Sequence, residues 1–456
     1  MSVANGGASV VLRRALPVAV LLLLNPRPGL ALDYEVAGRA SVGVTDNALA
    51  APSGTPGSGW DALLTLRGEA ALVWLRKYME HKLAYLFTLD TYLDSSAGET
   101  VGNALRWEAA YAPLSWLHIS TDFMATQGTL SSVDTMTSSG RAGILTVPSG
   151  PRPAAPLRFL TLDGRQGASV IFGPDWRLVQ GLSVQAFWPL QGDSGRASSQ
   201  AGDVSLGLER TFERSGISLS AHAMVNRASE VVTDGAVVEP YRRSYVAESM
   251  LGWRHTYSPA WSHFLAAGAL AAWVPAGSSV RWKPSGRVDI LAADAGRELV
   301  ISGERSASAD VYVGDIFLST RGSVAAGQIL DGPRRYGFRV LGSFNYSQAL
   351  ERDGGDRGSA KTWDVRSVFS LVVKRPIRLT FEYAFTYQSA THPPLPSPDV
   401  LPPFSSFHRN LFLVGAEIRY STFPAPDGSD RELRGPSDEL SGDPRADLDH
   451  RKNPRP

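Results

Sequence analysis

The fold can be predicted from one stretch of the chain, residues 363–388. It reads Trp363-Asp-Val-Arg-Ser-Val-Phe-Ser-Leu-Val-Val-Lys-Arg-Pro-Ile-Arg-Leu-Thr-Phe-Glu-Tyr-Ala-Phe-Thr-Tyr-Gln388. Apolar side chains occupy every second position of its latter half, namely Ile377, Leu379, Phe381, Tyr383, Phe385 and Tyr387. The positions between them hold Arg378, Thr380, Glu382, Ala384 and Thr386. A period of two is the signature of a β-strand. The earlier half alternates in the same way, so the stretch predicts a hairpin that turns at Lys374-Arg375-Pro376.

The N-terminus has the features of a secretory signal. Arg13 and Arg14 precede an apolar run over 15–24, and the small residues Gly29 and Ala31 follow. That run is too short to span a bilayer, so the sequence predicts a signal peptide over 1–31 that is cleaved after Ala31. An uncleaved anchor is the alternative. The chain contains no cysteine, which excludes disulfides, lipoprotein acylation and thiolate metal sites.

The period-two pattern recurs from residue 32 to 423 with no composition break that would mark a linker. It predicts 18 strands in one antiparallel up-and-down β-barrel, followed by a Pro- and charge-rich tail over 424–456 that we expect to be disordered and periplasmic. The expected strands are 32–45, 60–72, 80–93, 103–112, 115–125, 164–173, 182–190, 202–211, 216–226, 243–257, 261–274, 282–293, two within 297–330 whose break is not defined, 335–348, 363–373, 377–388 and 409–420.

The connections between these strands alternate between short turns and long loops. Short turns such as Ser258-Pro259-Ala260 carry neighbouring aromatics, among them Tyr257 and Trp261, whereas the other rim holds long loops, the longest over 127–163. This asymmetry and the aromatic girdle are typical of a transmembrane β-barrel. In hydrocarbon only helices and closed barrels satisfy every backbone polar group. A secreted protein made of several β-sandwiches is the alternative interpretation.

In a transmembrane barrel the apolar faces meet lipid and the polar faces line the interior. Eighteen strands enclose more space than side chains fill, so the sequence predicts an aqueous lumen, unless the loop over 127–163 plugs it. The predicted lumen charges are of both signs, which indicates weak selectivity for simple ions and is compatible with a neutral polar cargo such as carbohydrate. Tyr92 and Trp188 are the aromatics considered for an inward position. The candidate lumen-lining residues are Arg39, Arg67, Glu69, Lys82, Asp90, Arg106, Glu108, Arg366, Arg378, Glu382, Glu417 and Arg419.

No residue pattern indicates catalysis. His118, Ser120 and Asp122 include the three residue types of a hydrolase triad, but they follow one another along one strand about 7 Å apart per step, which is too far for a proton relay. His222 and His255 are isolated in the sequence and form no spacing typical of metal ligands. We therefore expect no enzyme activity, no cofactor, no metal and no nucleic-acid partner.

The segment Arg39-Ala-Ser-Val-Gly-Val-Thr-Asp-Asn47 resembles the first strand of outer-membrane barrels that accompany exopolysaccharide assembly systems. With the strand count, it makes the chain similar to the polysaccharide-export porins of myxobacteria. The resemblance implies export of a polysaccharide across the outer membrane, with a periplasmic polysaccharide-export protein as partner. Residues 412–420 also resemble the terminal strand signal of bacterial outer-membrane barrels, although the tail after Phe423 departs from that pattern.

The sequence thus predicts an outer-membrane β-barrel pore after signal cleavage, in contact with lipid and inserted by the barrel-assembly machinery. Polysaccharide translocation is the leading hypothesis for its function. The alternatives are a general diffusion porin for small solutes and a scaffold that presents loops at the cell surface.

Overall fold

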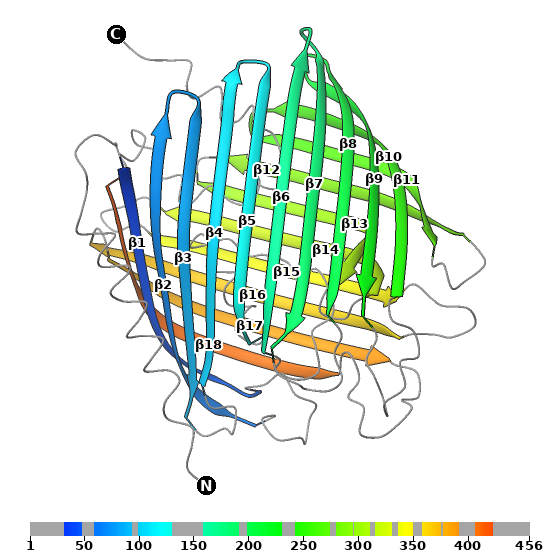
Figure 1. Cartoon of the computed structure of the whole chain (residues 1–456). Helices are drawn as coiled ribbons and strands as arrows, with labels where there is room; N and C mark the ends of the chain where they lie inside the picture. The colour runs from blue at the N-terminus through cyan, green and yellow to red at the C-terminus, as the bar shows by residue number, and fades with distance from the viewer. Residues whose placement is uncertain are drawn as a thin grey trace, which may run out of the picture.

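The computed structural model describes residues 32–47, 59–93, 99–129, 158–190, 198–229, 242–273, 280–294, 296–310, 315–330, 336–349, 358–374, 377–391 and 406–422. These residues form one 18-stranded sheet that closes on itself (Figure 1). Each strand pairs antiparallel with the next along the chain, and β1 (Leu32–Thr45) closes the ring by pairing with β18 (Phe407–Ser421). The predicted up-and-down barrel of 18 strands is therefore confirmed.

Most strands are longer than the sequence pattern predicted. The largest differences are at β6 and β7, which begin at Arg158 and Trp176 and not at residues 164 and 182. For β6, the pattern is obscured by the Ser- and Pro-rich segment before it. The region 297–330 divides into two strands around 311–314. The remaining strands are β2 (Asp61–Arg76), β3 (Met79–Tyr92), β4 (Glu99–Leu114), β5 (Leu117–Thr129), β6 (Arg158–Phe172), β7 (Trp176–Pro189), β8 (Ser199–Thr211), β9 (Ser215–Ala228), β10 (Arg242–Ser258), β11 (Trp261–Trp273), β12 (Arg281–Asp294), β13 (Arg297–Asp310), β14 (Asp315–Leu330), β15 (Tyr336–Ala349), β16 (Ser359–Lys374) and β17 (Ile377–Thr391).

Several predicted features lie outside the described residues. These are the signal peptide over 1–31, the tail over 424–456 and the central part of the long loop that we considered as a plug. Among the described residues, no helix is long and apolar enough to cross a membrane.

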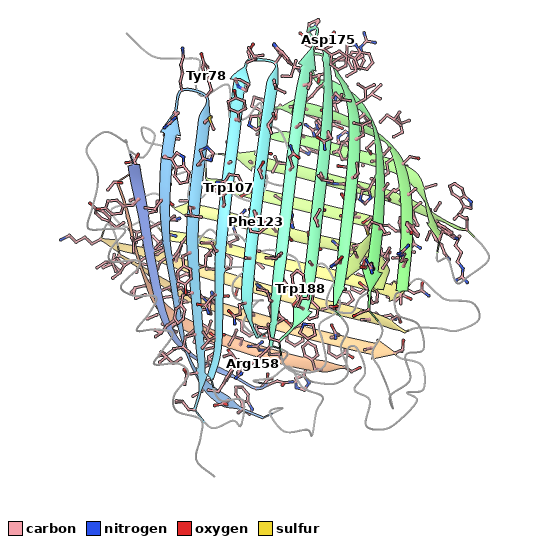
Figure 2. The ribbon with its side chains drawn as sticks, viewed as in Figure 1. Tyr78, Trp107, Phe123, Arg158, Asp175 and Trp188 are labelled. Carbon is pink, nitrogen blue, oxygen red and sulfur yellow. The ribbon has the colours of Figure 1, made fainter. Side chains whose placement is uncertain are left out.

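The outward face of the wall is apolar along its whole circumference. Trp107 and Phe123 form a cross-strand pair on this face, and both are exposed (Figure 2). Aromatic side chains mark two rims. Tyr78, Trp116 and Trp261 are exposed beside the short turns, and an opposite set near the long loops comprises Trp273, Trp282, Trp363 and Tyr387.

An apolar band between two aromatic girdles matches the hydrocarbon core and the two interfaces of a bilayer. A water-soluble β-protein would place those side chains in a dry core. Apart from the outer ends of β12 and β13, the wall also pairs its backbone polar groups within the protein, as hydrocarbon requires. The barrel therefore spans an outer membrane, as the sequence predicted.

Candidate functional site: the inner wall

The register of the strands places all twelve candidate lumen residues on the inward face. Arg39, for example, lies directly opposite Arg67 on β2 and Glu417 on β18. Glu382 shares this face, because Arg39 Nη2 donates a hydrogen bond to Glu382 Oε2 at 2.9 Å across the intervening strand β18. Lys82 is opposite Glu108 on β4, and Arg378 is opposite Glu417. The twelve side chains therefore share one face of the sheet.

Four of the predicted residues form one cluster on the inner wall, which we call the arginine cluster: Arg39, Arg67, Arg366 and Glu382. Glu382 is almost fully buried and lies within electrostatic range of all three guanidinium groups. The Arg67 and Arg366 Nε atoms are buried and have no hydrogen-bond partner. Three positive charges therefore surround one carboxylate. The neighbouring charges Asp90 and Arg409 are of opposite sign, so this pair leaves the excess of positive charge within the arginine cluster unchanged.

Four other predicted residues, Glu69, Lys82, Arg106 and Glu108, take part in ion pairs on the strands beside this cluster. Lys82 Nζ lies 2.8 Å from Glu35 Oε2 and 3.5 Å from Glu69 Oε1. Arg106 Nη2 lies 2.7 Å from Glu108 Oε1 and 2.7 Å from Asp122 Oδ2. Ion pairs that are partly open to water contribute little to stability. Their effect here is to fix long charged side chains flat against the wall.

Asp122 belongs to the trio with His118 and Ser120 that we rejected as a triad. In the structure Asp122 accepts two hydrogen bonds from the Arg106 guanidinium, through Nε at 3.1 Å and Nη2 at 2.7 Å. Its carboxylate thus serves the charged wall, as the strand spacing led us to expect.

A second cluster, which we call the acidic cluster, consists of Asp203, His222 and Glu248. His222 Nε2 is in hydrogen-bond contact with Asp203 Oδ2, and His222 Nδ1 lies 3.6 Å from Glu248 Oε2. The three residues come from β8, β9 and β10. The sequence showed His222 as an isolated histidine, because its two carboxylate neighbours are brought to it only by the strand register.

The two clusters lie on opposite walls of the barrel. The arginine cluster comes from β16, β17, β1 and β2, and is therefore centred on β18. The acidic cluster is centred on β9, which is half of the 18-stranded circumference away from β18. The residues of both clusters lie in the middle part of their strands. At mid-height, one wall of the lumen thus carries a cluster with three arginines and the opposite wall carries a cluster with two carboxylates.

The assignment of inward aromatic side chains was partly wrong. Tyr92 lies inward, on the same face as Asp90, and is buried. Trp188 is opposite Leu160 on the outward face, near the long-loop rim (Figure 2). The inward aromatic of β7 is its neighbour Phe187, which stacks on Phe159 with ring centroids 6.0 Å apart. A shift of one residue in the expected register explains this error, because it moves every side chain to the other face.

Over the described residues, no group of three or more His, Asp or Glu side chains could hold a metal ion.

Comparison with known proteins gives similarity in structure only. No protein-family model matches the chain, and no curated protein matches its sequence. Among solved structures, the chain is similar to OccK9 (OpdG) of Pseudomonas aeruginosa, with 10% identity, a TM-score of 0.43, and coverage of 86% of this chain and 99% of that one. OpdK of the same species, solved with vanillate, has 9% identity, a TM-score of 0.42, and coverage of 86% and 100%. The siderophore receptor PirA from Acinetobacter baumannii has 7% identity, a TM-score of 0.42, and coverage of 87% and 81%.

These similarities are too low to indicate what this chain transports. None of them supports the resemblance to polysaccharide-export porins.

Proposed function

We propose that this outer-membrane β-barrel is a passive pore for small hydrophilic solutes. The observation that carries the proposal is the inner wall, where charged and hydroxyl side chains occur on strand after strand while the outward face is apolar. An 18-stranded barrel is too wide for its own side chains to fill. A polar surface around such a space is compatible with water and with solutes that exchange hydrogen bonds with it.

The two charge clusters point to the solutes that would pass most readily. The arginine cluster attracts a carboxylate, and the acidic cluster on the opposite wall attracts an ammonium group. A solute that carries both charges can align with the field between the clusters, whereas a solute with one charge is attracted to one wall and repelled by the other. We therefore propose small zwitterions and neutral polar molecules as the preferred solutes.

Polysaccharide export, the leading hypothesis from the sequence, has no specific support on the described inner wall. A track for sugar rings would be expected to contain inward aromatic side chains in succession. Trp188 lies outward, and Tyr92 and Phe187 are buried at separate places on the wall. The diffusion pore, which was the alternative, is therefore preferred.

Liposome swelling tests the proposal. Liposomes that contain the purified protein are placed in isosmotic glycine, arabinose or a 10 kDa dextran, and the swelling rate is compared with that of protein-free liposomes. We expect swelling in glycine and arabinose and none in dextran. Rapid entry of dextran would favour a polymer conduit, and no swelling in any solute would contradict the pore.

A double variant tests whether the inner wall determines which solutes enter. Asp203→Asn combined with Glu248→Gln removes the negative charges of the acidic cluster with little change in volume. We expect glycine entry to fall relative to arabinose entry in this variant. An unchanged ratio would show that the acidic cluster does not face the path of the solute.

A further inference from the structure

The outer end of the β13–β14 hairpin leaves the barrel wall. β12 and β13 pair only from Asp294–Arg297 to Gly286–Arg305, although both strands continue. β12 runs on to Arg281 and β13 to Asp310 without pairing with each other. β13 and β14 remain paired to the end of the hairpin at Asp310–Asp315. The hairpin therefore separates from β12 as a unit.

The separated end is buried on both of its faces, unlike an ordinary barrel strand, which exposes its outward face. The exposed fractions are 0% for Ile316, 1% for Phe317, 5% for Leu318 and 1% for Ser319. Ile316 and Leu318, together with Ala307, pack on inward-facing side chains of β9, β10 and β11, namely Met224, Val246, Leu270 and Ala272. β14 thus contacts β9, from which four strands of the wall separate it.

The opposite face of the same segment packs on the neighbouring wall. Phe317 forms an apolar cluster with Ala349 of β15 and Ala360 of β16, against which Ala390 of β17 also packs. Ser319 Oγ and Ser347 Oγ form a hydrogen bond of 3.0 Å. The end of the hairpin is therefore held between two parts of the inner wall, inside the barrel and near the long-loop rim.

The outer part of β12, which the hairpin leaves unpaired, has residues that are typical of a sheet edge. Arg305 Nε donates a hydrogen bond to the Pro284 carbonyl oxygen at 3.2 Å. The main-chain polar groups of Pro284 therefore face β13. Proline has no N–H, so it leaves no unpaired donor on that side. Proline and lysine are typical of strand edges that have no partner, and Lys283 precedes Pro284. The sequence of β12 is thus suited to the loss of pairing.

The break lies within the membrane. Trp282 is 71% exposed and belongs to the aromatic girdle on the long-loop side, and Gly286, the last paired residue of β12, is four positions closer to the other rim. An unpaired carbonyl in hydrocarbon is costly. Arg305 satisfies the Pro284 carbonyl and also donates to Thr320 Oγ1 at 3.2 Å. This arrangement allows the wall to tolerate the separation.

We propose that the end of the β13–β14 hairpin is a gate, which closes the outer mouth in the structure and opens it by pairing with the free edge of β12. The proposal rests on the proposed pore function. The side chains that face β9–β11, including Ile316 and Leu318, are apolar and are equally suited to lipid in the paired position. Ser306, Ser308 and Ser319 would then line the lumen. Both positions of the hairpin are therefore compatible with its alternation of apolar and polar residues.

A buried carboxylate lies beside the gate contact. Glu248 is opposite Leu270 and two residues from Val246, both of which belong to the packed cluster. Its side chain is 4% exposed, and its Oε1 has no hydrogen-bond partner. Burial of a charge next to apolar side chains opposes the closed position. The closed and open positions can then be close in free energy, as a gate requires.

Disulfide trapping tests the gate, and the natural chain has no cysteine to interfere. Extending the register beyond Gly286–Arg305 would place Lys283 opposite Ser308. Hydrogen-bonded and non-hydrogen-bonded pairs alternate along an antiparallel ladder, and the main-chain groups of Pro284 face β13. The adjacent pair, Lys283 with Ser308, would therefore be a non-hydrogen-bonded pair, whose Cα separation of about 4.5 Å permits a disulfide. The test variant is therefore Lys283→Cys with Ser308→Cys. The matched control is Ser302→Cys with Ser323→Cys, whose native Oγ atoms are 2.6 Å apart in the structure.

Cross-linking is measured by electrophoresis and conductance by planar-bilayer recording, each before and after reduction. We expect the test pair to cross-link and the oxidised protein to have an open probability about tenfold higher or more, since a minor state is typically populated at 10% or less. The control pair should cross-link without this change. The reduced form of each variant checks its folding.

Failure of the test pair to cross-link where the control does would show that the hairpin is fixed, and would overturn the gate. Cross-linking without a change in conductance would show that the hairpin moves but does not close the path, and would overturn it too. If neither the oxidised nor the reduced protein conducts, the proposed pore function fails, and the gate fails with it. In that case the cross-linking result still shows whether the hairpin moves.

Discussion

Glu382→Gln is the substitution that most simply tests the arginine cluster. It removes the one carboxylate among Arg39, Arg67 and Arg366 and keeps the side-chain volume, so the inner wall gains one net positive charge. For 18 strands about 4.8 Å apart and tilted by about 40°, the wall lies roughly 18 Å from the barrel axis. A charge at the end of an inward side chain is then about 10 Å from the axis.

The expected effect on ion selectivity follows from Coulomb's law. One unit charge at about 10 Å in water is worth about 0.4 kcal/mol before screening. Screening leaves about 0.3 kcal/mol at 0.01 M salt and about 0.15 kcal/mol at 0.1 M, where the Debye lengths are about 30 and 10 Å. The charge attracts chloride and repels potassium equally. The ratio of chloride to potassium permeability should therefore rise about 2.5- to 3-fold at 0.01 M and about 1.7-fold at 0.1 M.

The assay is the reversal potential of the purified protein in a planar bilayer under a KCl gradient. Arg39→Gln should shift the ratio in the opposite direction, and the double variant Arg39→Gln/Glu382→Gln should return it close to the natural value. Heat-modifiable electrophoretic mobility checks that each barrel is folded. If Glu382→Gln conducts normally with an unchanged reversal potential at 0.01 M salt, the arginine cluster does not face the ion path.

Three further predictions concern the acidic cluster, the lipid-facing surface and the interrupted pairing between β12 and β13, which we call the broken ladder. Asp203→Asn should raise the chloride-to-potassium ratio in the same assay, by an amount similar to Glu382→Gln, and a fall would contradict the placement of the acidic cluster in the lumen. Leu219 is an outward residue that is 57% exposed, and Leu219→Arg should lower the free energy of unfolding by about 2–4 kcal/mol. Ser220→Arg, on the inward face, should change the free energy of unfolding little. Equal effects of the two substitutions in a urea titration would refute the assignment of faces. Arg305→Ala leaves two hydrogen-bond acceptors without their donor and should cost about 1–3 kcal/mol in the same titration, and no change would mean that the guanidinium does not stabilise the broken ladder.

The barrel and its two faces could be predicted from the sequence because lipid and water impose a period of two on every strand. All twelve candidate charges lie inward for this reason. The alternation does not determine where a strand begins inside a Ser- and Pro-rich segment, which is why β6 was expected six residues too late. It also does not determine the register when two aromatics are adjacent. Phe187 and Trp188 are such a pair, and the structure reverses their expected roles.

The clusters could not be predicted, because they depend on which strands are neighbours at a given height. His222 appeared isolated, because the two carboxylates beside it, Asp203 and Glu248, belong to the neighbouring strands β8 and β10 and are distant in the sequence. Mixed charge in the sequence therefore suggested a weak field, whereas the closed ring places a cluster with three arginines opposite a cluster with two carboxylates. The arginine cluster likewise requires closure, since β1 and β17 meet only around β18.

The gate was hidden from the sequence for a different reason. Ile316 and Leu318 have the spacing of a lipid-facing strand, and an apolar face packs on the protein's own wall as well as on lipid. The alternation is thus the same for both positions of the hairpin. Pro284 was the one local signal, because a proline inside a paired strand indicates an edge.

Single-channel recording of the purified protein distinguishes an open pore from a barrel that does not conduct. We expect discrete conductance steps in a planar bilayer, with a chloride-to-potassium ratio that rises in Glu382→Gln and falls in Arg39→Gln. Absence of steps above the bare bilayer, both in the natural protein and in the oxidised Lys283→Cys/Ser308→Cys variant, would contradict a pore through this barrel.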